Sequence, residues 1–217
     1  MRSLSPPHSP RPSQLLVETQ SSPDGVMAIS RSLPNFCRKY TSCAATFPFS
    51  STIRWMCSAP SDAIIPGQFC HLTSLPELGA KAFHFVRPDF ARKVQQGGRV
   101  VVAGEGWGSG SSREQAVLAL KGAGVLAIVA RSYAFIHKRN LVNEALPFLV
   151  VQDPRFYELA KEGEEIELDL ARGLLRVGGE EFHAEKPSAI IQALVGEGGI
   201  VPAIQHHGAT VFEKLTA

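Results

Sequence analysis

Two short apolar runs constrain the fold of this chain more than any other feature. Residues 99–103 read RVVVA and residues 125–130 read VLAIVA, and each run borders on glycine. Uninterrupted apolar runs of this length predict buried strands. Between them, a glycine-rich loop leads into apolar residues at helical spacing, which end at Gly122 and Gly124. This order of strand, loop, helix and strand predicts an α/β fold with parallel neighbouring strands.

The pattern continues after the second run. Residues 132–144 predict a helix with Ser132 at its N-cap, and residues 147–151 predict a third strand. Three alternating segments around RG and GG turns predict a small β-meander over residues 165–170, 174–177 and 181–183. Residues 187–195 begin with proline and predict a closing helix. The meander indicates a further sheet or sheet edge beside the α/β unit.

Residues 1–61 differ in composition from the remainder. The first 25 residues are rich in Ser and Pro, which is typical of disorder. Residues 27–61 contain no Asp or Glu, and their basic residues are interspersed with Ser, Thr, Ala and Phe, as in organelle transit peptides. We expect a disordered extension over residues 1–61 with a mitochondrial address, and a folded domain over residues 62–217. A plastid or cytoplasmic location, or a tail without an address, are the alternatives.

Charge and cysteine content exclude several classes of site. After residue 61 the chain holds sixteen Lys or Arg against eighteen Asp or Glu, so we expect no nucleic-acid partner. No apolar run approaches the roughly eighteen residues of a membrane span, so we expect no membrane association. The four cysteines form no C-x-x-C pair, which disfavours an iron–sulfur or zinc site built by this chain alone: Cys37, Cys43, Cys57 and Cys70.

The glycine loop, residues 104–115 with the sequence GEGWGSGSSREQ, carries the candidate site. It joins a predicted strand to a helix that opens near Ser112, so its backbone N–H groups and the positive helix end are expected to converge on an anion. The loop fits neither the Walker A pattern nor G-x-G-x-x-G, so support for a nucleotide is weak. Ser111, Ser112 and Arg113 instead suit a carboxylate. The alternative is that the serines cap the helix and Arg113 is a solvated charge.

Residues 104–116, GEGWGSGSSREQA, resemble the G-x-x-[FY]-G-x-GSSREHA signature of the swivel domain of the aconitase superfamily. The likeness continues through ARSYA, Ile136, Arg139-Asn140 and Leu146-Pro147. Upstream, the SDAIIPG segment, residues 61–67, resembles the pattern [ST]-D-x-I-I-P-[GA]. The resemblance covers about residues 62–205. Gln115 replaces the usual His and Trp107 the usual Phe or Tyr, whereas both serines and the arginine of the signature are present.

The resemblance implies a swivelling β/β/α domain of the aconitase C-terminal type, which is a separate small subunit in two-subunit relatives. A large partner subunit then holds a [4Fe-4S] cluster, whose open iron acts as a Lewis acid, and this chain binds none. The implied reaction dehydrates and rehydrates a hydroxy di- or tricarboxylate. Ser111 is implied to be the base, as an alkoxide, while Ser112 and Arg113 bind a substrate carboxylate. The chain is thus expected to act as a hydro-lyase, like 3-isopropylmalate dehydratase, only in a heterodimer with its large subunit.

Substrate choice is expected to depend on residues 69–73, FCHLT. In two-subunit relatives the corresponding loop contacts the variable arm of the substrate and resembles YLRT for a charged arm and YLVM for an apolar arm. Phe69 and Leu72 favour an apolar arm, hence 2-isopropylmalate and leucine biosynthesis. As a cation, His71 could instead meet a third carboxylate, as in a homoaconitase- or aconitase-like substrate. A solvent-facing His71 would select nothing.

Other interpretations remain open at this point. A non-catalytic swivel module that binds a carboxylate or a partner enzyme is the main alternative, and the presence of Ser111, Ser112 and Arg113 favours catalysis over it. A fragment of a single-chain aconitase is a third possibility, against which the transit-peptide-like segment argues. His206-His207 is disfavoured as a metal pair because adjacent side chains diverge. His137 is expected on the surface of its helix.

Overall fold

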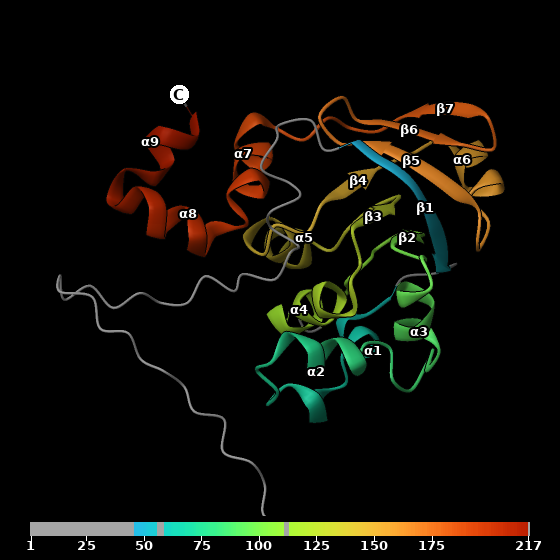
Figure 1. The fold of residues 1–217 in the computed structure, drawn as a ribbon, viewed down its shortest axis with the longest axis horizontal. Coiled ribbons are helices and arrows are strands. Elements are labelled where there is room, and N and C mark those ends of the chain that lie inside the picture. Colours follow the sequence, from blue (N-terminus) through green and yellow to red (C-terminus); the bar gives the residue numbers. More distant parts are fainter. Residues whose placement is uncertain (1–45, 56–58, 111–112, 217) are drawn as a thin grey trace, which may run out of the picture. The chain divides into compact units, whose positions relative to one another are not determined.

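A mixed sheet forms the centre of the folded chain (Figure 1). The computed structural model describes residues 46–55, 59–110 and 113–216. Within them, seven strands pair in the order β4-β3-β2-β1-β5-β6-β7. The parallel strands are β1 (Thr46–Trp55), β2 (Val100–Ala103), β3 (Ala127–Ala130) and β4 (Phe148–Val150). The antiparallel strands are β5 (Glu165–Asp169), β6 (Leu174–Val177) and β7 (Glu180–His183). The predicted α/β class and β-meander are confirmed.

Helices connect the strands and follow the meander. Between β1 and β2 lie α1 (Ser61–Ile64), the 3-10 helix η2 (Gly67–Phe69), α2 (Leu75–Ala80) and α3 (Phe90–Gln95). Next along the chain come α4 (Glu114–Ala123), α5 (Phe135–Asn143) and α6 (Pro154–Leu159). The last are α7 (Ala189–Glu197), α8 (Ile200–His207), the 3-10 helix η3 (Gly208–Thr210) and α9 (Val211–Thr216). The helix expected at residues 187–195 is therefore followed by two more.

Strand β1 lies inside the segment that was expected to be a disordered extension. It pairs with β2 through Thr52↔Val100 and with β5 through Ser50↔Ile166, so it joins the parallel and antiparallel halves of the sheet. The expected domain boundary at residue 61 is therefore corrected, because residues 46–55 belong to the fold. The sequence of β1, TFPFSSTIRW, has neither an apolar run nor regular alternation, and pairing on both edges outweighs this weak pattern.

The sheet buries apolar side chains on both faces. Val101 and Ala103 of β2 lie in one core, together with residues of α1–α5. Val100 and Val102 of the same strand lie in a second core with α6 and the strands β5–β7. Successive residues of a strand point to opposite faces, so RVVVA needs apolar side chains throughout. Figure 1 shows α1–α4 gathered on one side of the parallel strands.

Helix α4, whose first turn follows the glycine loop, is held against α2 through two glycines. A Cβ on Gly122 would lie 1.9 Å from the carbonyl oxygen of Leu75. A Cβ on Gly79 would lie 2.2 Å from the carbonyl carbon of Gly122. Only a hydrogen atom fits at these two positions. Gly124 closes α4 with a left-handed φ of 100°, which confirms the predicted helix end.

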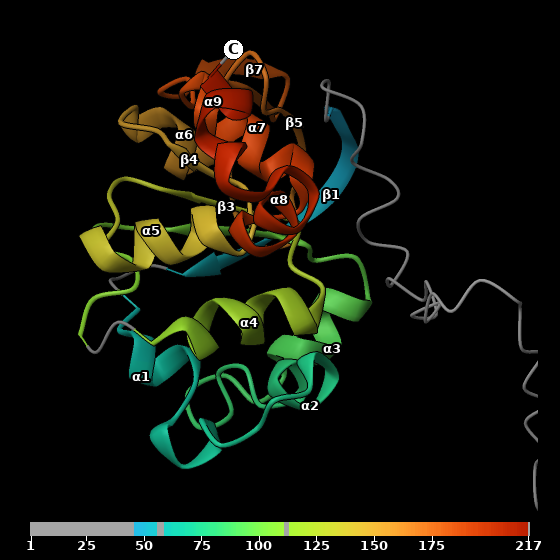
Figure 2. The ribbon, with the colours of Figure 1, turned by 90° about the vertical axis from the view of Figure 1, so that its left-hand side faces the viewer.

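The C-terminal helices lie beside α5 (Figure 2). Helices α7 and α8 contact α5. A small separate core holds this part together through Leu194, Ala203, Val211 and Leu215. Among the described residues, every helix is too short or too polar to span a bilayer.

Candidate functional site

The glycine loop leaves the carboxyl end of β2 and is anchored by Trp107. The Trp107 side chain is fully buried, with its ring centroid 6.1 Å from that of Phe83 and 6.4 Å from that of Trp55. Its backbone N–H donates to the Ser132 carbonyl at 3.0 Å, and its carbonyl accepts the Ala134 N–H at 2.9 Å. The core thus accommodates the indole that replaces the usual Phe or Tyr, and the loop is tied to the segment before α5.

Hydrogen bonds hold the glycine loop from two sides. On one side the Gly106 N–H donates to the Ser132 hydroxyl at 2.8 Å. On the other side the Gly108 N–H donates to the Ala59 carbonyl at 2.8 Å. Gly106 and Gly108 adopt φ angles of 65° and 76°, which glycine takes without strain. The prediction that Ser132 caps the next helix is wrong: the N-cap of α5 is Ala134, and Ser132 binds the loop instead.

The N–H groups of residues 106–109 already have protein acceptors. In addition to the three bonds above, the Ser109 N–H donates to the Gly106 carbonyl at 3.2 Å. The expectation that several loop N–H groups converge on an anion is therefore wrong for these four positions. The Ser109 carbonyl in turn accepts the Ser61 N–H at 2.8 Å, which places the SDAIIPG segment beside the loop. The N-terminus of α4 and Arg113 are the remaining features of this region with the positive charge that an anion would need.

Arg113 stands at the N-cap of α4 and reaches across to the SDAIIPG segment. Its Nη1 lies 2.9 Å from Oδ1 of Asp62 and 3.7 Å from Sγ of Cys70. The guanidinium also covers Gly67, where a Cβ would lie 3.1 Å from Nη1. The Arg113 side chain is 34% exposed and that of Asp62 is 57% exposed. An incoming carboxylate can therefore reach the guanidinium from solvent.

Of the predicted loop residues, Arg113 lies at the N-cap of α4, and its contact with a substrate carboxylate stays a prediction. Ser111 and Ser112, the predicted base and its neighbour, lie outside the described residues. Their roles stay predictions.

The FCHLT stretch lies next to Arg113, but through a residue other than those predicted. Phe69 is half-buried against the core, with its ring centroid 5.2 Å from that of His84. Leu72 packs against the same core, and His71 is exposed. Cys70 is the member of this stretch that touches Arg113. The contacts of Phe69, His71 and Leu72 with a substrate stay predictions.

Asp62 and Cys70 are the two site residues that sequence reasoning missed. No spacing rule connects either of them with Arg113, because they meet only after β2 and the glycine loop have folded back beside α1. The available signal for Asp62 was its place in SDAIIPG, where the resembled pattern also has an acidic residue. Cys70 gave no comparable signal, since FCHLT matches neither pattern for the variable arm.

His137 lies directly beneath the glycine loop rather than on the surface. Its side chain is fully buried, and a Cβ on Gly108 would lie 2.1 Å from its Cγ. Burial lowers the pKa of His137 from 6.5 to about 4, so the ring is neutral near pH 7. Neither ring nitrogen has a hydrogen-bond partner among the residues that the structure describes. The expected surface position is wrong because the first turn of α5 faces the loop.

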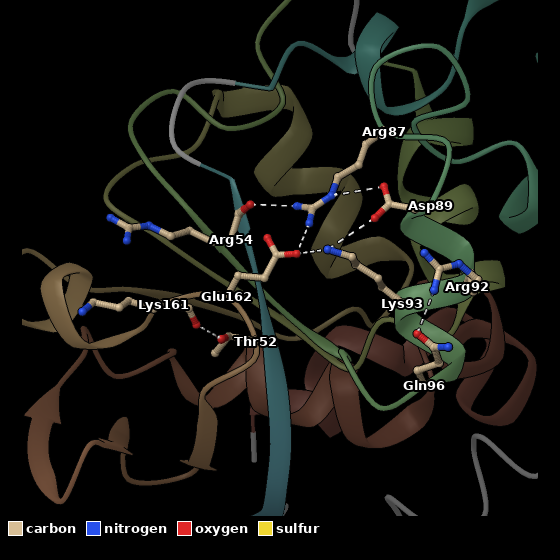
Figure 3. A network of polar contacts seen from close by, with 9 residues as sticks. All are labelled: Thr52, Arg54, Arg87, Asp89, Arg92, Lys93, Gln96, Lys161 and Glu162. Carbon is tan, nitrogen blue, oxygen red and sulfur yellow. Dashed lines mark hydrogen bonds and ion pairs between the residues drawn. The ribbon is translucent and has the colours of Figure 1, made fainter.

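An ion-pair network fastens the helices near the site to the middle of the sheet (Figure 3). Arg87 donates to the Arg54 carbonyl of β1 at 2.9 Å and to the carboxylate of Glu162. Glu162 also pairs with Lys93, which lies 3.3 Å from Asp89. Burial alone would raise the pKa of Glu162, but the hydrogen bonds and charges of Lys93 and Arg87 outweigh it and lower that pKa.

Metal ligands are sparse in the described part of the chain. Its free cysteine is Cys70, and those residues contain no group of three or more His, Cys, Asp or Glu side chains that could hold a metal ion. His206 and His207 both bond to Glu197, at 2.8 Å and 2.9 Å. The described residues thus offer no ligand set for an iron–sulfur cluster.

A family model and a solved structure match this arrangement. Residues 62–153 match the aconitase C-terminal domain. The crystal structure of 3-isopropylmalate dehydratase from Methanocaldococcus jannaschii aligns with 76% of this chain and 98% of its own, with a TM-score of 0.68 and 30% sequence identity.

The curated relatives fall into two length classes. A 3-isopropylmalate dehydratase small subunit 2 from Archaeoglobus fulgidus is 39% identical over 68% of this chain and 88% of its own. The 3-isopropylmalate dehydratase small subunit from Pyrobaculum aerophilum is 48% identical over 54% of this chain and 70% of its own. Aconitase AMT8 from Alternaria alternata is 40% identical over 71% of this chain, which spans only 18% of that relative. The chain belongs to the aconitase C-terminal domain family, which includes the small subunits of 3-isopropylmalate dehydratase.

Proposed function

We propose that this chain is the small subunit of a heteromeric iron–sulfur hydro-lyase that converts 2-isopropylmalate to 3-isopropylmalate by dehydration and rehydration, as in leucine biosynthesis. The observation that carries this proposal is the Arg113–Asp62 pair, at 2.9 Å, between the glycine loop and the SDAIIPG segment. It holds a partly exposed guanidinium at a helix N-terminus, ready for a carboxylate. Relatives named as 3-isopropylmalate dehydratase small subunits, at 38% to 48% identity, support the choice of substrate.

Arg113 binds one carboxylate of the substrate. A guanidinium donates two parallel hydrogen bonds to a carboxylate, which fixes orientation as well as charge. Asp62 holds the guanidinium in the chain alone, so substrate binding exchanges one carboxylate for another and leaves the charge balanced. Ser112, directly before Arg113 in the sequence, adds a hydroxyl donor to the same carboxylate.

Ser111 acts as the base that removes the carbon-bound proton. A serine hydroxyl is a poor base near neutral pH, so its alkoxide needs strong local stabilisation. The N-terminus of α4, the Arg113 guanidinium and a closed, dry site provide this stabilisation. Arg113 and Asp62 are both solvent-accessible in this chain, so exclusion of water requires a large subunit to cover them.

The large subunit carries the iron–sulfur cluster, which we propose to be of the [4Fe-4S] type. When bound there, the cluster supplies the Lewis acid for the departing hydroxyl group. The residues described in this chain offer no ligand set for it, and Cys70 lies against Arg113 instead. The tasks of this chain are therefore carboxylate binding, orientation and proton transfer.

The variable arm of the substrate lies against the FCHLT stretch. Phe69, Cys70 and Leu72 all pack partly buried against the apolar core next to Arg113. An apolar surface favours an isopropyl group over a third carboxylate, because burying an unpaired charge costs free energy. The exposed His71 keeps a homoaconitase- or aconitase-like substrate as the alternative.

Co-expression with candidate large subunits tests the proposed function. After anaerobic reconstitution of the cluster, 2-isopropylmalate, homocitrate and citrate are assayed in parallel. We expect the complex to turn over 2-isopropylmalate fastest and each chain alone to be inactive. Turnover by this chain alone contradicts the proposal. A stable complex that turns over none of the three substrates contradicts it as well, and indicates a non-catalytic binding module.

We further propose that the residues before β1 direct the chain to the mitochondrion. The support is their acid-poor, basic and Ser-rich sequence. Because β1 begins at Thr46 and pairs within the sheet, a cleavable signal must end before that residue. A fluorescent protein fused to residues 1–45 is expected to co-localise with mitochondria. Fluorescence in plastids or in the cytosol contradicts this address.

A further inference from the structure

His137 is a buried polar side chain to which the proposed reaction assigns no task. Thr52 and Ser61 are also buried, and each donates a hydrogen bond to a carbonyl oxygen. The indole nitrogens of Trp55 and Trp107 are buried without a hydrogen-bond partner among the described residues, and at His137 both ring nitrogens lack one. A neutral imidazole has one donor and one acceptor, and burying them unpaired costs free energy. A phenyl ring would fill the space without this cost, so packing alone does not explain a histidine here.

The His137 ring supports the glycine loop at Gly108. A Cβ on Gly108 would lie 2.1 Å from Cγ, 2.4 Å from Cδ2 and 2.5 Å from Cβ of His137, so the backbone rests directly on the side chain. From the other side, the Ala59 carbonyl accepts the Gly108 N–H at 2.8 Å. Gly108, three residues before Ser111 in the sequence, is therefore held on both sides.

Helix α5 fixes the ring relative to both the loop and the core. Just before α5, the Ala134 N–H donates to the Trp107 carbonyl at 2.9 Å. One turn after His137, Leu141 is fully buried in the core that contains α1–α4. A movement of the loop relative to α5 would therefore change the contact between Gly108 and the imidazole.

We propose that His137 is a positioning residue for the glycine loop. Its neutral ring supports Gly108, and one ring nitrogen forms a hydrogen bond with the loop once the large subunit and the substrate are in place. This inference rests on the proposed function. Among the described residues, the N–H groups of residues 106–109 donate to other acceptors and neither nitrogen of the ring has a partner. His137 acts on the reaction only through the loop that carries Ser111.

Two substitutions of His137 in the reconstituted complex separate hydrogen bonding from packing. H137F keeps the carbon atoms that touch Gly108 and removes both nitrogens. We expect kcat to fall by at least about tenfold, KM to stay within about threefold, and the melting temperature not to decrease. H137N keeps a donor and an acceptor and should recover part of the lost kcat. A loss of less than tenfold in H137F, or an equal loss in H137N, overturns the proposal.

A glycine pair tests the contact itself. Gly108 and Gly179 have φ angles of 76° and 80°, but a Cβ on Gly179 meets nothing within 4 Å. G179A therefore introduces the same backbone strain without a neighbour. We expect G108A to lower kcat at least about tenfold more than G179A, and the double variant H137A/G108A to lose less than the two single losses combined. Equal effects of G108A and G179A, or additive losses in the double variant, overturn the proposal.

Amide hydrogen exchange separates failure of this inference from failure of the proposed function. In the complex, H137A is expected to speed exchange in residues 104–110 by at least about tenfold, with or without turnover. If the wild-type complex turns over no hydroxy acid while H137A still loosens the loop, the proposed function fails and the positioning role stands. Unchanged exchange in H137A overturns the positioning role, whether or not the wild-type complex is active.

Discussion

Arg113 contributes to the site through its geometry more than through stability. Its pair with Asp62 is partly exposed, with 34% and 57% of the two side chains accessible. Pairs of this kind stabilise a fold by only about 0–1 kcal/mol, because water screens the charges. The pair instead keeps a planar group with two donor edges beside the start of α4. Lysine carries the same charge without this geometry.

We therefore expect R113K to impair substrate binding while leaving the fold intact. In the reconstituted complex, KM should rise by about ten- to a hundredfold, because a point charge replaces two directed hydrogen bonds. The melting temperature should stay within about 2 °C of wild type. R139K, at an exposed position on α5, serves as the control and should leave KM unchanged. A KM for R113K equal to that of wild type contradicts the assigned role.

His137 makes the stability of the fold depend on pH. Its pKa is about 4 in the folded chain and 6.5 as the ordinary value, so between these pH values the unfolded chain binds a proton that the folded chain does not. Stability is therefore lost as pH falls through this window. Between pH 7 and pH 5 the loss amounts to about 2 kcal/mol. The free energy of unfolding, measured with denaturant at pH 7 and pH 5, should fall less in H137F than in wild type. Equal losses in H137F and wild type contradict the burial of a neutral ring.

At the scale of elements, the sequence predicts those strands whose own residues show by their hydrophobicity that they are buried. Strands β2 and β3 are buried on both faces, so they appear as unbroken apolar runs. Strand β1 has a mixed sequence and is a strand because β2 and β5 pair with its two edges. No local pattern carries that information. The end of α4 at Gly124 was predicted correctly because its signal lies in adjacent residues. Strand β1 was missed because it depends on pairing with strands that are distant in the sequence.

The site shows the same division. The glycine loop and the position of Arg113 at a helix start were predictable, because both depend on residues that are adjacent in the sequence. The Arg113–Asp62 pair was not, since it depends on the Ser61–Ser109 hydrogen bond that brings two distant segments together. The prediction that the loop N–H groups bind an anion was wrong for residues 106–109, for a related reason. Glycine frees the backbone to bind an anion or a protein carbonyl, and only the fold decides between them.

The packing of α2 on α4 can be tested with one added methyl group. G122A places a Cβ within 1.9 Å of the Leu75 carbonyl oxygen, so the helices must separate. We expect a destabilisation of about 1–3 kcal/mol in denaturant unfolding. G196A in α7 is the matched control, because a Cβ there meets nothing within 4 Å. It should be neutral or stabilise by up to about 1 kcal/mol through helix propensity. Equal stabilities of the two variants contradict the close helix contact.

At the scale of the whole molecule, the network of Arg87 and Glu162 links the helices beside the site to the end of β1. The pKa of Glu162 is lowered, so its contribution to stability is present above its ordinary pKa and is lost as pH falls through the lowered value. E162Q should lower the melting temperature at pH 7 and lose less stability on acidification to pH 3. E158Q is the control, because Glu158 pairs with an exposed Arg155. An acid response of E162Q equal to that of wild type contradicts the network.

Under the proposed function, the molecule as a whole presents half of an active site. Arg113 and Asp62 form a partly exposed ion pair beside the glycine loop, while the described residues offer no ligand set for a metal. The proposed turnover of a hydroxy acid assigns the metal, and the cover over the loop, to a second chain. Holding the loop in a defined position before the partner binds lowers the entropic cost of forming the complete site.

Turnover by the S111A complex tests most directly the central claim that the glycine loop supplies the base. We predict that 2-isopropylmalate turnover by the reconstituted complex falls by at least about a hundredfold in S111A, the usual effect of removing a general base. Assembly with the large subunit should be unchanged, and S188A at the N-cap of α7 should retain full turnover. An S111A complex that turns over 2-isopropylmalate within tenfold of wild type would contradict the account.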